Sequence, residues 1–197
     1  MSTIPLQHAA FEGEWKLPSR GVVAMYSFIA AESAIFTIFV VAYIYFIGRS
    51  IYGPSPKVLE VPIFNTVCLL SSSLTIWIAE HRLARNSRSG FIAFWFITFV
   101  LGTIFLAGTA REWQRLIYHD GLTIRTNVFG TTYYSLVGLH ASHVTVGLSM
   151  ILTVLLFAVT GHLHEKHAER IQVLAMYWHF VDAVWVVVFT VVYIVGR

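Results

Sequence analysis

Charged residues are scarce in this chain. Asp, Glu, Lys and Arg make up 12% of its 197 residues, whereas hydrophobic residues make up 57%. A soluble domain carries about a quarter charged residues, so this sequence has too little charge for a surface that faces water. The deficit excludes an ordinary soluble protein and indicates that lipid surrounds most of the chain.

Other common features are missing as well. The single cysteine, Cys68, lies inside an apolar stretch, which excludes an intramolecular disulfide framework and a cysteine-based metal site. The net charge of +3 comes without a basic run, so no footprint for nucleic acid is present. Residues 1–20 have no apolar core, and we expect no cleavable signal peptide there. The loops contain no glycine-rich phosphate loop, nucleophile elbow or paired-carboxylate site.

Long apolar stretches are what the sequence does contain. A bilayer core about 30 Å thick needs about 20 apolar residues of helix, and continuous apolar runs favour helices over barrel strands. The sequence therefore predicts an all-α integral membrane bundle of five transmembrane helices. We expect a polar N-terminal segment at residues 1–20 and one membrane domain at residues 21–197, with helices at about 21–47, 62–79, 91–110, 128–160 and 171–196.

The distribution of basic residues gives a weak orientation signal. Seven lie on the side of the amino terminus and six on the opposite side. The positive-inside rule thus favours a cytoplasmic amino terminus and a periplasmic carboxyl terminus. The first group is Lys16, Arg20, Arg82, Arg85, Arg88, Lys166 and Arg170, and the second is Arg49, Lys57, Arg111, Arg115, Arg125 and Arg197.

Five ionisable side chains fall at membrane depth: Glu32, His140, His143, His179 and Asp182. Each costs at least about 2.5–3.5 kcal/mol there unless it is paired or neutral, so each is a functional hypothesis. His140 and His143 stand three residues apart, as do His179 and Asp182, so each pair shares a helix face. If the two faces met, three imidazoles and a carboxylate would converge inside the bundle.

Two interpretations of these residues remain open at this stage. Imidazole is a common ligand of metals and haem, but the bulky neighbours Tyr177, Trp178 and Phe180 leave little room for a macrocycle. An interhelical hydrogen-bond cluster that fixes packing also explains these residues, and we favour this interpretation. Glu32 is interpreted as a proton-binding site, as a hydrogen-bond partner of a helix or lipid headgroup, or as a buried neutral acid.

Several motifs along the chain match the pattern of one family of membrane proteins. Residues 177–185 read YWHFVDAVW, similar to the family's final helix. Residues 138–144 read GLHASHV, similar to its paired-histidine motif, and residues 30–32 resemble the segment that carries its buried acid. Residues 65–75 parallel its Asn-Thr and Ser-Ser stretch, and Glu112-Trp113 occupies the place of its Glu-aromatic pair. Together these motifs resemble the subunit III family of haem-copper respiratory oxidases, and the resemblance covers residues 21–196.

Three departures from the family pattern stand out. By this resemblance we expect the chain to lack the first two helices of the seven-helix mitochondrial form and to match five-helix bacterial versions, so the lipid cleft that those two helices build is not carried over. Ala141-Ser142 replaces Gly-Leu between the paired histidines. Arg111 precedes Glu112, where the family usually has a small or aromatic residue, and provides a charge that can pair with the acid.

The resemblance implies a non-catalytic core subunit that binds no cofactor or metal itself. Haem and copper are expected in partner subunits. The resemblance also implies direct packing on oxidase subunit I, contacts with other oxidase subunits and membership of a larger respiratory supercomplex. Structural phospholipids, support of proton uptake and a bacterial inner-membrane location are also implied. The buried polar residues that carry over are Glu32, Glu112, His140, His143, His179 and Asp182.

Alternatives are a subunit-III-like protein associated with nitric oxide reductase, a free-standing membrane cytochrome and a small transporter. A cytochrome would bind haem when expressed alone. A transporter often has an internal repeat or a broken helix, and neither is visible in the sequence. The electron donor of the oxidase, cytochrome c or quinol, is left open because its site lies on other subunits.

Overall fold

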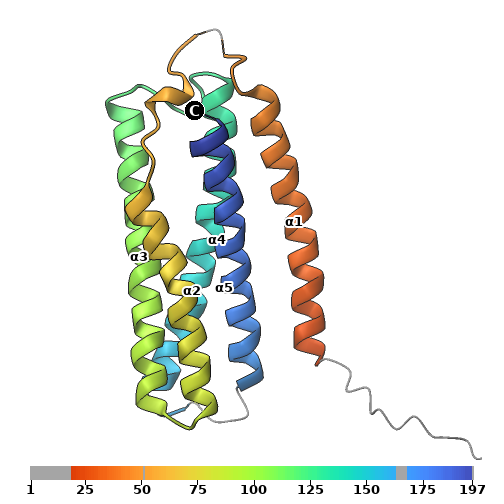
Figure 1. Ribbon diagram of the computed structural model, residues 1–197, viewed down its shortest axis with the longest axis vertical. Coiled ribbons are helices and arrows are strands. Elements are labelled where there is room, and N and C mark those ends of the chain that lie inside the picture. Colours follow the sequence, from red (N-terminus) through yellow and green to blue (C-terminus); the bar gives the residue numbers. More distant parts are fainter. Residues whose placement is uncertain (1–18, 51, 163–167, 197) are drawn as a thin grey trace, which may run out of the picture.

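A computed structural model describes residues 19–50, 52–162 and 168–196. Five long helices run up and down in a bundle, and the described residues contain no strand (Figure 1). Each helix is long and apolar enough to cross a membrane, which confirms the predicted fold class. The helices are α1 (Arg20–Phe46), α2 (Ile63–Ala84), α3 (Arg88–Tyr118), α4 (Val128–Val159) and α5 (Ala168–Phe189), and a π-helical turn (Thr190–Val195) continues α5.

The helix bounds differ from the predicted apolar stretches where polar residues continue a helix. The third helix runs to Tyr118, eight residues beyond the apolar run that ends at residue 110. Glu, Gln, Arg and Leu in this extension are good helix formers, so the change to polar residues marks the edge of the apolar span and not the end of the helix. Of the polar segment at residues 1–20, only Ser19 and Arg20 are described. Lys16, Lys166 and Arg197 also lie outside the described residues.

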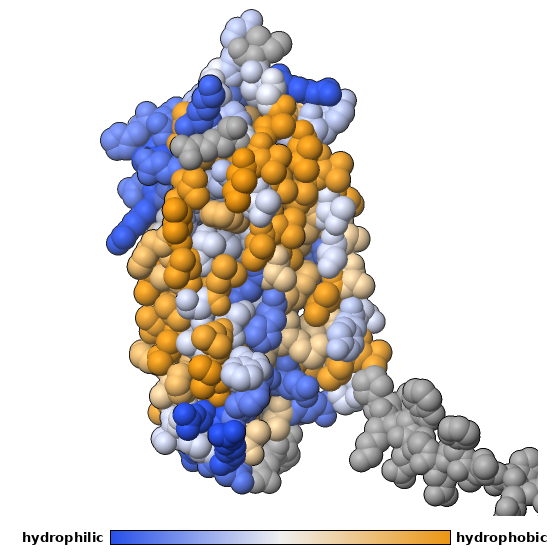
Figure 2. All heavy atoms as spheres, viewed as in Figure 1, coloured by the Kyte–Doolittle hydropathy of each residue, from blue (hydrophilic) through white to orange (hydrophobic). Residues whose placement is uncertain are grey.

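The helices are not equally buried. Helices α2 and α3 form a closely packed hairpin, α5 lies against both α2 and α4, and α1 stands at the edge, where it packs on α4 and α5 (Figure 1). Phe36 and Tyr43 are the fully enclosed side chains of α1. The outer surface is apolar along much of the helices, and hydrophilic residues gather at the two ends (Figure 2). This distribution is the one that a bilayer requires.

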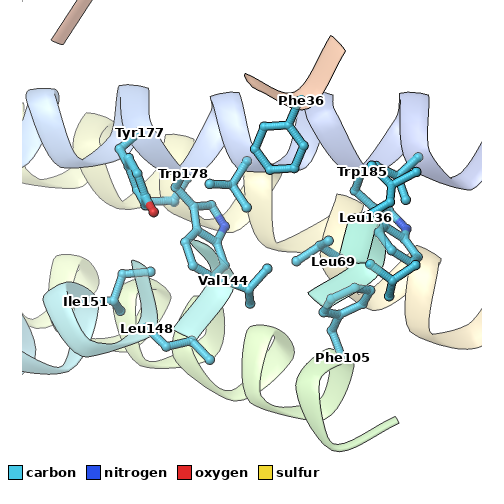
Figure 3. Close-up of a cluster of buried hydrophobic side chains, with 14 of the residues drawn as sticks. Phe36, Leu69, Phe105, Leu136, Val144, Leu148, Ile151, Tyr177, Trp178 and Trp185 are labelled. Atoms are coloured by element: carbon cyan, nitrogen blue, oxygen red, sulfur yellow. The ribbon is translucent and has the colours of Figure 1, made fainter. Parts of the chain in front are cut away.

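The centre of the bundle is built from large aromatic side chains. Trp178 and Trp185 of α5 point between α3 and α4, where they meet Leu148, Val144, Leu136 and Phe105 (Figure 3). A Cβ atom on Gly102 or Gly147 would stand 2.9 or 2.8 Å from the Trp178 ring. Small residues at these two positions let α3 and α4 approach the indole ring closely.

The connection between α1 and α2 is held on the ends of α3 and α4. Asn127 caps α4 by accepting a hydrogen bond from the Gly130 amide at 2.8 Å, and its amide group donates to the carbonyl oxygens of Tyr52 and Pro54. A side-chain oxygen at this position satisfies an otherwise unpaired amide at the helix start. The same residue therefore caps a helix and anchors a loop.

Candidate functional site

The first polar contact between helices joins α1 to α4 and is partly buried. Oε2 of Glu32 lies 3.2 Å from Nε2 of His143. The other ring nitrogen of His143, Nδ1, is 2.9 Å from the carbonyl oxygen of Leu139, and the Tyr177 hydroxyl of α5 donates to the His143 carbonyl oxygen at 2.9 Å. These contacts connect three helices around one imidazole.

The geometry of this pair sets its number of protons. A carbonyl oxygen only accepts, so Nδ1 of His143 carries a hydrogen and donates to Leu139. The contact between Nε2 and the Glu32 carboxyl group then needs one further proton, on the carboxyl oxygen or on the ring. The pair has no net charge in either arrangement, since it is a neutral acid beside a neutral imidazole in one and a carboxylate beside an imidazolium in the other. It can hold one proton and transfer it between the two groups.

A second polar cluster joins α5 to α2. The hydroxyl of Ser73 donates to Oδ2 of Asp182 and accepts from Nδ1 of His179 at 3.0 Å. Asp182 is 3% exposed, and its Oδ1 has no hydrogen-bond partner among the described residues. Next to it, the indole nitrogen of Trp178 donates to the hydroxyl of Ser72 at 2.8 Å. Neighbouring serines of α2 thus bind neighbouring turns of α5.

His140 is enclosed by aromatic rings instead of polar groups. It is fully buried, and neither ring nitrogen has a hydrogen-bond partner within the described part of the chain. Its ring centroid lies 4.9 Å from that of Trp185 and 5.8 Å from that of Phe105. Because no counter-charge is near, a neutral imidazole is the form that this surrounding tolerates.

A third cluster lies at the end of the bundle where the carboxyl terminus is. The Glu112 carboxylate of α3 accepts hydrogen bonds from the Tyr193 hydroxyl at 2.9 Å and from the Tyr133 hydroxyl at 3.2 Å. The expected pairing of Arg111 with this acid is not found, because two tyrosines from α4 and the π-helical turn take its place. Among the residues that the structure describes, Arg115 forms ion pairs instead, with Glu60 and Asp120.

The two polar faces predicted on α4 and α5 do not meet. His143 turns to α1, whereas His179 and Asp182 turn to α2. Across the described residues, no three His, Cys, Asp or Glu side chains come together in a way that could hold a metal ion. Each cluster links different helices, so the chemistry that this arrangement offers is helix connection and proton binding.

Sequence reasoning missed the hydroxyl partners of these acids. Ser73 lies in a run of hydroxyl residues that is equally able to bond back to its own helix, as Ser72 and Thr75 do. Tyr133 and Tyr193 lie within apolar spans, and the signal that could have found them is that a buried tyrosine hydroxyl needs a partner. Which acid supplies it depends on how the helices pack.

Comparison with known proteins identifies the family of this bundle. Residues 19–197 match the family of cytochrome c oxidase subunit III. The chain is 34% identical to cytochrome c oxidase subunit 3 of Bacillus sp. (strain PS3), over 98% of this chain and 91% of that protein. It is 36% identical to cytochrome c oxidase subunit 3 of Synechocystis sp., over 85% of this chain and 72% of that protein.

Quinol oxidases have similar subunits. The chain is 30% identical to quinol oxidase subunit 3 of Bacillus spizizenii, over 89% of this chain and 87% of that protein. The family match spans all five helices, including the segments that carry Glu32, His143 and Asp182. This chain therefore belongs to the cytochrome c oxidase subunit III family.

Proposed function

We propose that this chain is the non-catalytic third subunit of a respiratory haem-copper terminal oxidase, in which partner subunits reduce oxygen and pump protons. The observation that carries the proposal is the set of polar contacts between helices. Glu32, Asp182 and Glu112 each bond to a side chain of another helix, and the described residues contain no cluster with metal-ligand geometry. Such contacts hold helices together and bind protons, and a redox centre is not needed to explain them.

The proposal extends to the partners and the surroundings of the chain. Haem and copper belong to partner subunits, and direct packing on subunit I is the contact that a third subunit would make. Broad apolar helix surfaces support contact with lipids and with other oxidase subunits, including those of a larger respiratory supercomplex. The location is the bacterial inner membrane, with the amino terminus in the cytoplasm and the carboxyl terminus in the periplasm.

The polar contacts between helices suggest how the subunit acts. Glu32 and His143 share one proton at the junction of α1 and α4, so the pair is a candidate for proton exchange in support of proton uptake. Asp182, Ser73 and His179 connect α5 to α2, and their role in the proposal is to keep residues 21–197 together as one membrane domain.

The test is purification of the tagged chain from its native membrane in mild detergent. We expect it to co-elute with a large haem-containing subunit and to bring cyanide-sensitive oxygen uptake. Addition of cytochrome c or quinol then identifies the donor. A chain that elutes alone and colourless would refute the oxidase assignment. A purified complex that reduces nitric oxide would instead identify the chain as a subunit-III-like protein of nitric oxide reductase. A chain that elutes alone with a haem spectrum would return the histidines to the role of ligands.

A further inference from the structure

Arg111 lies between two cavities at the end of α3. One has a volume of about 350 Å³ and exposes Glu60, Asn65 and Glu112, and it is called the acidic cavity below. The other has a volume of about 270 Å³ and is lined by Gln114, Tyr118 and His119, whose side chains carry hydrogen-bond donors, and it is called the donor cavity. Arg111 and Arg115 line both, so the two cavities adjoin.

The two arginines differ in what they bind. Arg115 is engaged by the protein itself, in an ion pair with Glu60 and in a 2.8 Å hydrogen bond to the Val58 carbonyl oxygen. Arg111 is exposed and makes no hydrogen bond or ion pair with any described residue. Its guanidinium group therefore keeps all its donors for a ligand.

The acidic cavity has unused capacity for a cation. The Glu112 carboxylate accepts from tyrosines, and a carboxylate has about four acceptor positions. The Glu60 side chain is paired with Arg115 but remains 79% exposed. The Asn65 amide packs on Gly108, where a Cβ atom would collide with it, and its polar atoms have no partner among the residues described. The carboxylates thus lie in the acidic cavity, beside the two arginines, and no carboxylate of the described residues lines the donor cavity.

The position of the cavities suits a lipid headgroup. Arg111 is seven residues before the end of α3 at Tyr118, which is about 10 Å along the helix axis. Ile63 and Phe64 begin α2 beside the acidic cavity and are 65% and 70% exposed. In Figure 2, hydrophilic residues extend over this end of α3 next to the apolar surface. The site therefore lies at the level where headgroups meet the hydrocarbon core.

We propose that the phosphoethanolamine headgroup of a membrane lipid binds across the two cavities. The phosphate lies on Arg111 and the donors Gln114, Tyr118 and His119, and the ammonium group lies in the acidic cavity near Glu60 and Glu112. Arginine binds phosphate through paired charge-assisted hydrogen bonds. A primary ammonium donates to carboxylates, whereas a choline group has no hydrogen to donate and a glycerol headgroup brings no positive charge to the acids.

This inference deepens the lipid binding included in the proposed function, and it requires only that the five helices span a membrane. It names a headgroup class and a position at the end of α3. A failure of the oxidase assignment would leave it open to test, because bound lipid can be counted on the tagged chain whether or not haem subunits accompany it.

The experiment compares wild type with Arg111→Gln and with Arg125→Gln. Arg125 is an exposed arginine at the same end of the molecule that lines neither cavity, so it controls for the loss of charge. The tagged complex is incorporated into nanodiscs of phosphatidylethanolamine and phosphatidylglycerol, extracted with mild detergent, and the retained lipids are counted by native mass spectrometry. Soluble glycerophosphoethanolamine is then added as a competitor, which separates recognition of the headgroup from recognition of the membrane.

We expect Arg111→Gln to reduce phosphatidylethanolamine retention roughly tenfold or more, since a charge-assisted phosphate contact is lost. Arg125→Gln should retain the lipid as wild type does, and the soluble headgroup should displace it. Equal retention by all three proteins overturns the proposal. A selective loss of phosphatidylglycerol overturns the headgroup assignment. Dissociation of a partner subunit from Arg111→Gln with unchanged lipid would identify Arg111 as a protein contact instead.

Discussion

Substitution of Gly147 by alanine tests the packing at the centre of the bundle. A Cβ atom at this position would stand 2.8 Å from two ring carbons of Trp178 and 3.2 Å from the Tyr177 ring. The indole cannot retreat easily, because Gly102 of α3 lies against another edge of the same ring and its nitrogen donates to Ser72 of α2. The extra methyl group therefore has to displace a rigid ring that contacts three helices.

The steric cost of the added methyl group can be separated from the change in helix propensity that comes with replacing a glycine. Overpacking of a tight interior costs roughly 1–3 kcal/mol, whereas replacing a helical glycine by alanine gains roughly 1 kcal/mol in helix propensity. Gly138→Ala is the matched control, since it lies on the same helix and its Cβ would meet Trp113 at an ordinary 3.4 Å. Both variants receive the propensity gain, so the difference between them reports the steric term.

The assay is thermal unfolding of the purified complex in mild detergent. We expect Gly147→Ala to unfold roughly 2–12 °C below Gly138→Ala, from about 2–4 °C per kcal/mol for a chain of this size. Trp178→Phe removes ring atoms from the contact, so it should reduce the cost of Gly147→Ala measured in its background. Equal stability of the two glycine variants, or a cost that is unchanged by Trp178→Phe, would refute this account of the core.

Three further substitutions test the polar contacts. Glu32→Gln should leave assembly and the first turnovers of oxygen reduction largely intact, because the amide can still donate to Nε2 of His143. Loss of activity from the first turnover would show that Glu32 takes part in the reaction itself. Asp182→Leu should lower the thermal midpoint of the complex by several degrees, because it removes the acceptor of the partly buried Ser73 hydroxyl at about 1–3 kcal/mol for a lost partner, and stability equal to wild type would contradict a structural role. Tyr193→Phe should destabilise the complex by about 0.5–1.5 kcal/mol, because it removes a hydrogen bond to Glu112. The same assay measures this change, and Phe189→Leu, which does not affect the bonds to Glu112, is the control.

The fold was predictable because its signal is local. Each apolar run fixes a helix by itself, since hydrocarbon cannot satisfy a free peptide group, and the five helices found are the five expected. The end of α3 was not predictable in the same way. Arg111 to Tyr118 continue the helix. The hydropathy of the sequence shows where the chain leaves the apolar layer, but it does not show where the helix ends.

The candidate site was predictable in its residues and not in its contacts. Glu32, His143 and Asp182 stand out because an ionisable group inside a bilayer is costly. The shared helix faces of His140 with His143 and of His179 with Asp182 suggested one convergent cluster. The structure separates these residues into different clusters, because the rotation of each helix about its axis is set by packing with its neighbours.

The sequence alone thus determined the membrane environment, the number of helices and, through its motifs, the family, all of which depend on composition and order along the chain. Only the tertiary structure decided the partners. Glu32 and His143 are separated by 111 positions and Ser73 and Asp182 by 109, so their contacts exist only once α1 lies on α4 and α2 on α5. The physical reason is that a polar group inside a membrane has to find a partner, and which partner it finds depends on which helix faces are pressed together.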